Sequence, residues 1–338
     1  MVMQNGKEKK VYTTVMNKIE KVKVALDVVL YYFTIYTVFD ILSITLPYLL
    51  FKGGMEISDV LRSYAPGYVP FIVVIIFLAI FSKLLKKKVQ GSISLENKPL
   101  IFIIVGMLLI ITGVTSIISY VSIIGIFLEH LSPNESPSLM DGIYRVIVSI
   151  VVCVVQIGIG TCITFIAIKR EKQIEKIRVA LDVALYYFAI TTVLNLVSKI
   201  VSDSLFKSNR ELISGLKLGL LYYAVLAVVI FILAILSNTL KKKVHGCISI
   251  NSKSLILIIV GVLLIINGVT SIPTEVSWIS LYHIRLIETG ISQIEETQYL
   301  NTIYWAISHI VFYTFQIAVG AYFTFKAIKR DKHIEATY

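Results

Sequence analysis

The chain has few of the residues from which soluble enzymes build their active sites. Only 16% of its 338 residues are charged, and it contains five histidines, three cysteines and two tryptophans. It has no HExxH and no GxSxG motif, which excludes the common zinc-protease and serine-hydrolase sites. We therefore expect no catalytic residues, and a lipid-active membrane enzyme ranks last among the functions considered.

The cysteines and histidines do not form a metal-binding or redox pattern. Cys153 and Cys162 share one apolar run and Cys247 lies in a basic connection, with no CxxC or Cys/His spacing. Neither a metal site nor a disulfide framework is predicted. Only His309 lies in an apolar run, whereas a bis-histidine haem site needs two facing histidines. We expect no cofactor.

Long apolar runs are what the chain has in excess. It is 57% hydrophobic, with a mean hydropathy of +0.83, whereas soluble domains are about 45–50% apolar. These runs predict an all-α integral membrane protein. Eight membrane spans are expected, over 24–51, 68–85, 99–128, 142–168, 179–206, 218–240, 254–281 and 302–328. The first run is too long for a cleaved signal and is expected to remain as an anchor.

The chain is one unit written twice. IIVGMLLIITGVTSI (103–117) returns 155 residues later as IIVGVLLIINGVTSI (258–272), with two changes. KVALDVVLYYF (23–33) and KKKVQGSISL (86–95) return at the same displacement. The sequence predicts two tandem four-helix repeats, 24–172 and 173–330, between an N-terminal segment (1–23) and a tail (331–338). Four spans per copy give both copies the same orientation, related by a pseudo-twofold axis along the membrane normal.

The charges predict which side of the membrane faces the cytoplasm. The termini, the even-to-odd connections and the adjoining span ends hold 24 of the 32 Lys and Arg residues with nine acids, a charge of +15. The opposite side holds eight basic and 12 acidic residues, a charge of −4. The positive-inside rule therefore predicts that both termini are cytoplasmic. Because the basic residues flank the spans and form no groove, nucleic acid is not an expected partner.

A layer of polar residues recurs between the midplane and the outer third of the spans. Asp40 is the costliest of them, since an ionisable group is expensive at this depth, and it is taken as the only charge of the layer. The candidate polar path comprises Asp40, Thr37, Thr115, Ser116, Gln156, Thr192, Asn195, Thr270, Ser271 and Gln316. The alternative is interhelical hydrogen-bond glue, and the two interpretations are equally favoured.

Two features near the cytoplasmic side have simpler interpretations. Asp27 and Asp182 each follow a base by four residues, a spacing that favours an ion pair at the start of a helix over a proton relay. The lysines of the two KKKVxGxIS connections are candidate contacts for anionic lipid phosphates, although a stop-transfer signal is the simpler explanation. These lysines are Lys86, Lys87, Lys88, Lys241, Lys242 and Lys243.

The small residues and the polar layer together do not decide between a transporter or channel and an accessory subunit. Gly106 and Gly113, matched by Gly261 and Gly268, indicate close helix packing. The duplicated polar layer favours a transporter or channel for a small solute or ion, with its path between the repeats. The scarcity of charge within the spans favours instead a non-catalytic accessory subunit that binds membrane partner subunits. The lipid bilayer, with anionic lipids at its cytoplasmic face, is the partner expected in every case.

Overall fold

The computed structural model describes residues 2–50, 57–88, 97–129, 137–171, 174–206, 223–224, 226–240, 250–287 and 293–336. This part of the chain is helical throughout. The long helices are α1 (Val2–Leu50), α2 (Ile57–Lys88), α3 (Asn97–Glu129), α4 (Pro137–Glu171), α5 (Ile174–Phe206), α7 (Ile250–Ile287) and α8 (Gln293–Ala336).

Seven of these helices are long and apolar enough to cross a bilayer, which makes the chain a polytopic membrane protein. The spans are Ile19–Pro47, Tyr68–Leu85, Lys98–Val121, Gly142–Lys169, Lys176–Val201, Lys253–Ile284 and Tyr299–Arg330. They match seven of the eight spans expected from hydropathy. The remaining predicted span, 218–240, is described continuously only over the shorter apolar helix Leu226–Leu240.

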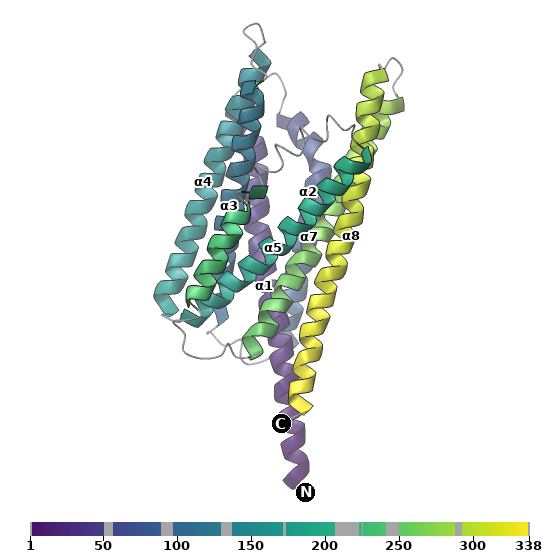
Figure 1. The fold of residues 1–338 in the computed structure, drawn as a ribbon. Helices are drawn as coiled ribbons and strands as arrows, with labels where there is room; N and C mark the ends of the chain where they lie inside the picture. Colours follow the sequence, from purple (N-terminus) through teal and green to yellow (C-terminus); the bar gives the residue numbers. More distant parts are fainter. Residues whose placement is uncertain are drawn as a thin grey trace.

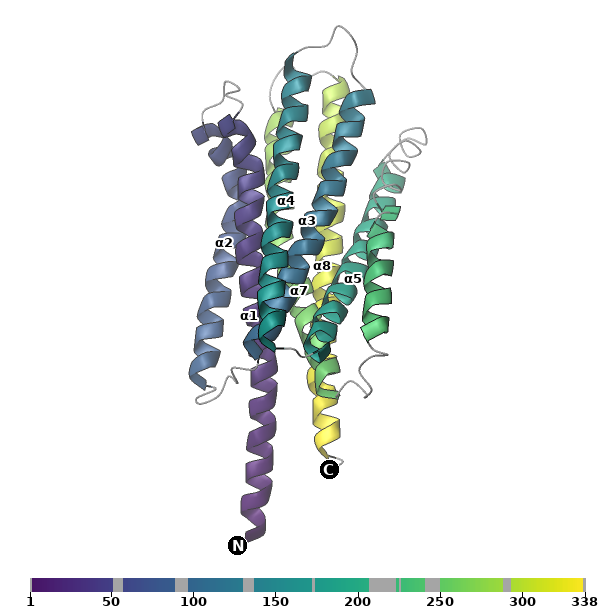
Figure 2. The ribbon, with the colours of Figure 1, turned by 90° about the vertical axis from the view of Figure 1, so that its left-hand side faces the viewer.

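The helices form an elongated bundle in which α3 packs along α4 and α7 packs along α8 (Figures 1 and 2). Helix α1 contacts α2, α3 and α4 and also α7, while α5 contacts α7, α8 and α3. The start of α1 and the end of α8 lie at the same end of the bundle (Figures 1 and 2). Near that end, the buried Lys21 Nζ of α1 donates a hydrogen bond of 2.7 Å to Ser254 Oγ of α7.

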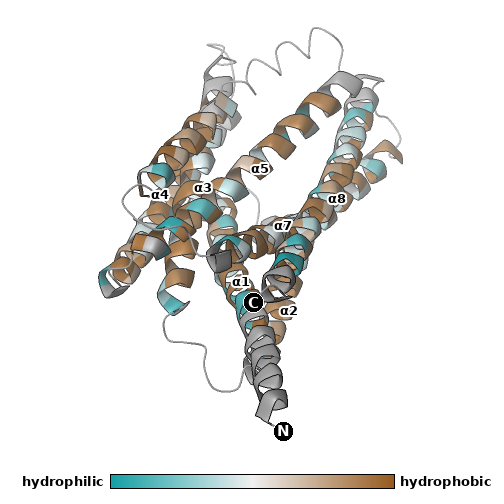
Figure 3. Cartoon of the chain, turned by 60° about the horizontal axis from the view of Figure 1, so that its bottom comes forward, coloured by the Kyte–Doolittle hydropathy of each residue, from teal (hydrophilic) through white to brown (hydrophobic). Residues whose placement is uncertain are grey.

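The buried core comes mainly from α1, α3, α5 and α7. Val28 of α1, Leu108 of α3, Ala184 of α5 and Leu263 of α7 are all fully buried. Hydrophobic residues predominate along the helices, drawn brown in Figure 3, and many large ones are exposed, such as Phe165 of α4 at 66%. Because water would penalise so large an exposed apolar surface, this surface is suited to contact lipid.

Glycines set the closest helix contacts. A Cβ placed on Gly106 of α3 would lie 2.6 Å from the carbonyl oxygen of Gly160 on α4, and one on Gly261 of α7 would lie 2.6 Å from that of Gly320 on α8. Only glycine allows the backbones to approach this closely. The packing role predicted for Gly106 and Gly261 is confirmed.

Helix α1 continues through Pro47, which cannot donate a hydrogen bond to the carbonyl of Ser43. The Ser149 hydroxyl of α4 donates to this Ser43 oxygen at 2.9 Å. An unsatisfied carbonyl is costly in hydrocarbon, so a side chain from a neighbouring helix replaces the lost backbone bond. The same contact ties α1 to α4.

Candidate functional site

A cavity of about 300 Å³ lies between α1 and α2 on one side and α7 and α8 on the other. Its position joins elements from the two halves of the sequence. It is lined by Asp40 and Ile44 of α1, Tyr68 and Phe71 of α2, Ser271, Thr274, Glu275 and Trp278 of α7, and Tyr313 of α8. Trp278 is 41% exposed and stands at the rim.

Two carboxylates line the cavity from opposite halves. Asp40 is partly buried, and Glu275 is only 7% exposed. In the described part of the chain, Glu275 Oε2 is a buried atom with no hydrogen-bond partner. The expectation that Asp40 is the only charge of the polar layer is therefore wrong, since Glu275 also faces this space. An ionisable side chain within a span is expensive, which makes Glu275 a candidate functional residue.

The imidazole of His309 on α8 lies near the other oxygen of Glu275. Its Nδ1 lies 3.7 Å from Glu275 Oε1, and its ring lies against Trp305 with the centroids 3.9 Å apart. Lys199 of α5 is close enough to act on His309 electrostatically, but it is not part of the cavity lining.

Of the residues predicted to form a polar path, Asp40 and Ser271 line this cavity. The Ser271 hydroxyl donates a hydrogen bond to Asn267 O of its own helix at 2.8 Å, which leaves its oxygen able to accept another. The structure brings these two residues together across the boundary between the halves.

The two glutamines join helices within each hairpin. Gln156 Nε2 of α4 donates to Leu109 O of α3 at 3.1 Å and to Thr112 Oγ1 at 2.8 Å. Gln316 Nε2 of α8 donates to Leu264 O of α7 at 3.1 Å. Both are at least 95% buried, so these contacts have the character of interhelical glue.

The remaining predicted path residues are dispersed. Thr115 donates to Thr112 O at 3.0 Å and Thr270 to Ile266 O at 2.9 Å, each within its own helix. Thr37 is buried, Ser116 and Thr192 are partly buried, and Asn195 is exposed on the outer face of α5. Lys86, Lys87 and Lys88 end α2 but their side chains lie outside the described residues, as do Lys241, Lys242 and Lys243 entirely.

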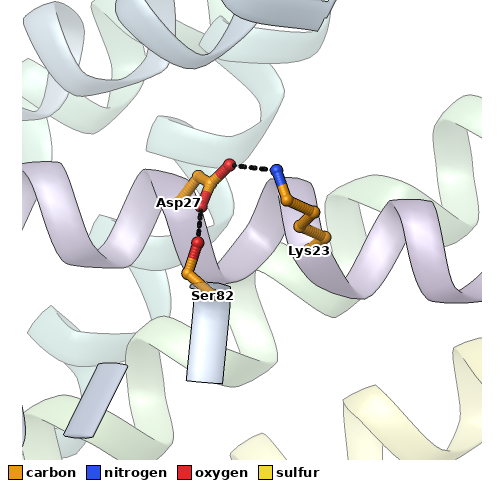
Figure 4. A network of polar contacts seen from close by, with 3 residues as sticks. All are labelled: Lys23, Asp27 and Ser82. Carbon is orange, nitrogen blue, oxygen red and sulfur yellow. Dashed lines mark hydrogen bonds and ion pairs between the residues drawn. The ribbon is translucent and has the colours of Figure 1, made fainter. Parts of the chain in front are cut away.

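A second polar network lies near the N-terminal end of the bundle (Figure 4). Lys23 Nζ lies 3.0 Å from Asp27 Oδ2, which confirms the predicted ion pair, and Ser82 of α2 donates a hydrogen bond to Asp27 Oδ1. The pair does not lie at the start of a helix as expected, because α1 begins at Val2. Ser237, 155 residues after Ser82, donates in the same way to Asp182. In each copy an acid of one helix thus accepts a hydrogen bond from the next helix.

We expect Ser82→Ala and Ser237→Ala each to lower the free energy of unfolding by about 1.5–3 kcal/mol, because each removes a hydrogen bond to a charged group. Thermal unfolding of purified protein in mild detergent measures the change. Thr239→Ala is the matched control, since its exposed hydroxyl donates a hydrogen bond to Ile235 O of its own helix. Equal losses of unfolding free energy in all three variants would contradict a stabilising role for the Ser82–Asp27 and Ser237–Asp182 hydrogen bonds.

Comparison of the chain with known protein families, curated proteins and solved structures finds no match. The geometry of the cavity is therefore the evidence for the candidate site. Glu275 is the residue that sequence reasoning missed, although its span was identified. The available signal was a departure from the repeat, since Glu275 falls where the first copy has Tyr120. After the third predicted span the displacement between the copies grows from 155 to 160 residues, so His309 falls where the first copy has Ser149.

Proposed function

We propose that this protein is a transporter or channel for a small solute or ion, with its path between the two halves. One observation supports the proposal above the others: the cavity at the junction of α1, α2, α7 and α8 holds carboxylates from both halves. Substrate sites of secondary transporters commonly lie at such a repeat interface, at membrane depth. A purely structural junction would gain nothing from two acids within the spans.

The architecture that goes with this proposal has eight spans in two four-helix repeats of the same orientation. Matched contacts 155 residues apart support it, among them the Ser82–Asp27 and Ser237–Asp182 bonds. The positive-inside rule supports cytoplasmic termini. We further propose that Lys86–Lys88 and Lys241–Lys243 contact anionic lipid phosphates on the cytoplasmic side.

Fewer residues are assigned to the path than to the polar layer. We assign Asp40, Ser271 and Glu275 to the path, because they line the cavity. Gln156 and Gln316 hold the hairpins together through backbone carbonyls. The assignment separates residues whose loss should abolish flux from residues whose loss should reduce stability.

Reconstitution of the purified protein in liposomes tests the function. Solid-supported membrane recordings with Na⁺, K⁺, choline and tetramethylammonium gradients report any net charge movement, and uptake of radiolabelled choline reports exchange. We expect flux of at least one of these probes above that of empty liposomes. An accessory subunit would give none, and that result would contradict the proposal.

A further inference from the structure

Aromatic side chains form much of the wall of the cavity. Four of its nine lining residues are aromatic: Tyr68 and Phe71 of α2, Trp278 of α7 and Tyr313 of α8. The faces of aromatic rings carry negative electrostatic potential and attract cations, tryptophan and tyrosine most strongly. These rings come from three helices.

The charge of the lining is negative. Asp40 and Glu275 contribute carboxylates, and none of the nine lining residues is lysine or arginine. His309 meets Glu275 Oε1 only, and Oε2 has no hydrogen-bond partner in the described part of the chain. A carboxylate oxygen buried to this degree needs a positive or hydrogen-bonding partner. The cavity supplies the space for one.

We infer that the cavity binds a small organic cation, a quaternary ammonium or a protonated amine. The carboxylates attract the positive charge while the rings contact the alkyl groups around the nitrogen. A volume of about 300 Å³ is at the small end of ligand pockets and suits a compact ligand. The inference names the substrate class of the proposed path and rests on that proposal.

An inorganic cation suits the lining less well. Hard cations need six or more oxygen ligands, whereas a wall of rings offers few. No group of three or more His, Cys, Asp or Glu side chains suited to hold a metal ion occurs among the described residues. The combination of two acids with four rings therefore favours a cation that carries its own apolar surface.

Choline and its neutral carbon analogue 3,3-dimethylbutan-1-ol provide the test, because they differ in charge but hardly in shape. Trp305→Phe leaves Trp278 as the single tryptophan, and its fluorescence in detergent reports occupancy. We expect saturable change with choline, and binding at least about tenfold weaker for the alcohol. If Trp305→Phe does not fold, calorimetry on the unmodified protein measures the same two affinities.

Glu275→Gln and Asp40→Asn are each expected to weaken choline binding at least about tenfold, whereas Glu296→Gln, which removes an exposed acid of α8, leaves it unchanged. Equal affinity for choline and the alcohol, no binding of either, or equal affinity for Na⁺ would overturn the inference. Flux of Na⁺ without choline binding would overturn it and leave the proposed function standing. Choline binding without flux of any probe would leave the inference standing and contradict the proposed function.

Discussion

Replacing Gly160 with alanine is expected to destabilise the protein by about 1–3 kcal/mol, whereas Gly158→Ala, two residues earlier, leaves its stability unchanged or slightly raised. A Cβ on Gly160 would lie 2.8 Å from the carbonyl oxygen of Gly106 and 3.1 Å from Leu109 Cβ. A backbone oxygen cannot move aside as a flexible side chain can, so α3 and α4 must separate. A Cβ on Gly158 meets nothing within 4 Å.

The second copy of the sequence already contains the same contrast. The counterpart of Gly158 is Ala318, while the counterpart of Gly160 is Gly320. Gly320→Ala should therefore repeat the loss of stability, because its Cβ would lie 2.5 Å from Gly261 O. Thermal unfolding in one detergent, with all variants side by side, measures the differences. Equal unfolding temperatures for Gly158→Ala and Gly160→Ala would contradict the close contact of α3 with α4.

Asp40→Asn and Glu275→Gln are each expected to reduce flux in liposomes at least about tenfold, with unfolding temperatures near that of the parent protein. Each change keeps the size of the side chain and removes a charge that lines the cavity. Losing one charged contact with a bound cation corresponds to about 1.5–3 kcal/mol, or roughly 10–100-fold.

Two controls separate a role in the path from a role in folding. Glu296→Gln removes an exposed acid and should leave flux intact. Gln156→Ala removes two interhelical hydrogen bonds and should lower the unfolding temperature more than the flux per folded molecule. Full flux in both Asp40→Asn and Glu275→Gln would contradict the assignment of the path to this cavity.

Hydropathy alone was sufficient to predict the helical membrane architecture. The run at 99–128 is predominantly apolar, and the candidate membrane span of α3 is Lys98–Val121, more than half of it buried. Glycine spacing likewise predicted the close contact of Gly106. Both features depend on residues near one another along a single helix, which is why one sequence reveals them.

The site was predictable only in part because it depends on contacts between distant helices. Asp40 drew attention as a lone acid deep in a span, and it does line the cavity. Gln156 looked equivalent by depth, but it points to a backbone carbonyl of α3. Depth along a helix does not say which face a side chain occupies. The pairing of Glu275 with His309 crosses from α7 to α8 and has no periodic signal.

A path between the halves requires above all that the two copies lie parallel in the membrane, with both basic connections in the cytoplasm. Lys86→Cys and Lys241→Cys, each placed as the single cysteine after replacement of Cys153, Cys162 and Cys247, test this directly with a membrane-impermeant maleimide. We predict that neither is labelled in intact cells and that both are labelled once the membrane is permeabilised. Labelling of one but not the other in intact cells would contradict the parallel arrangement and, with it, the path between the halves.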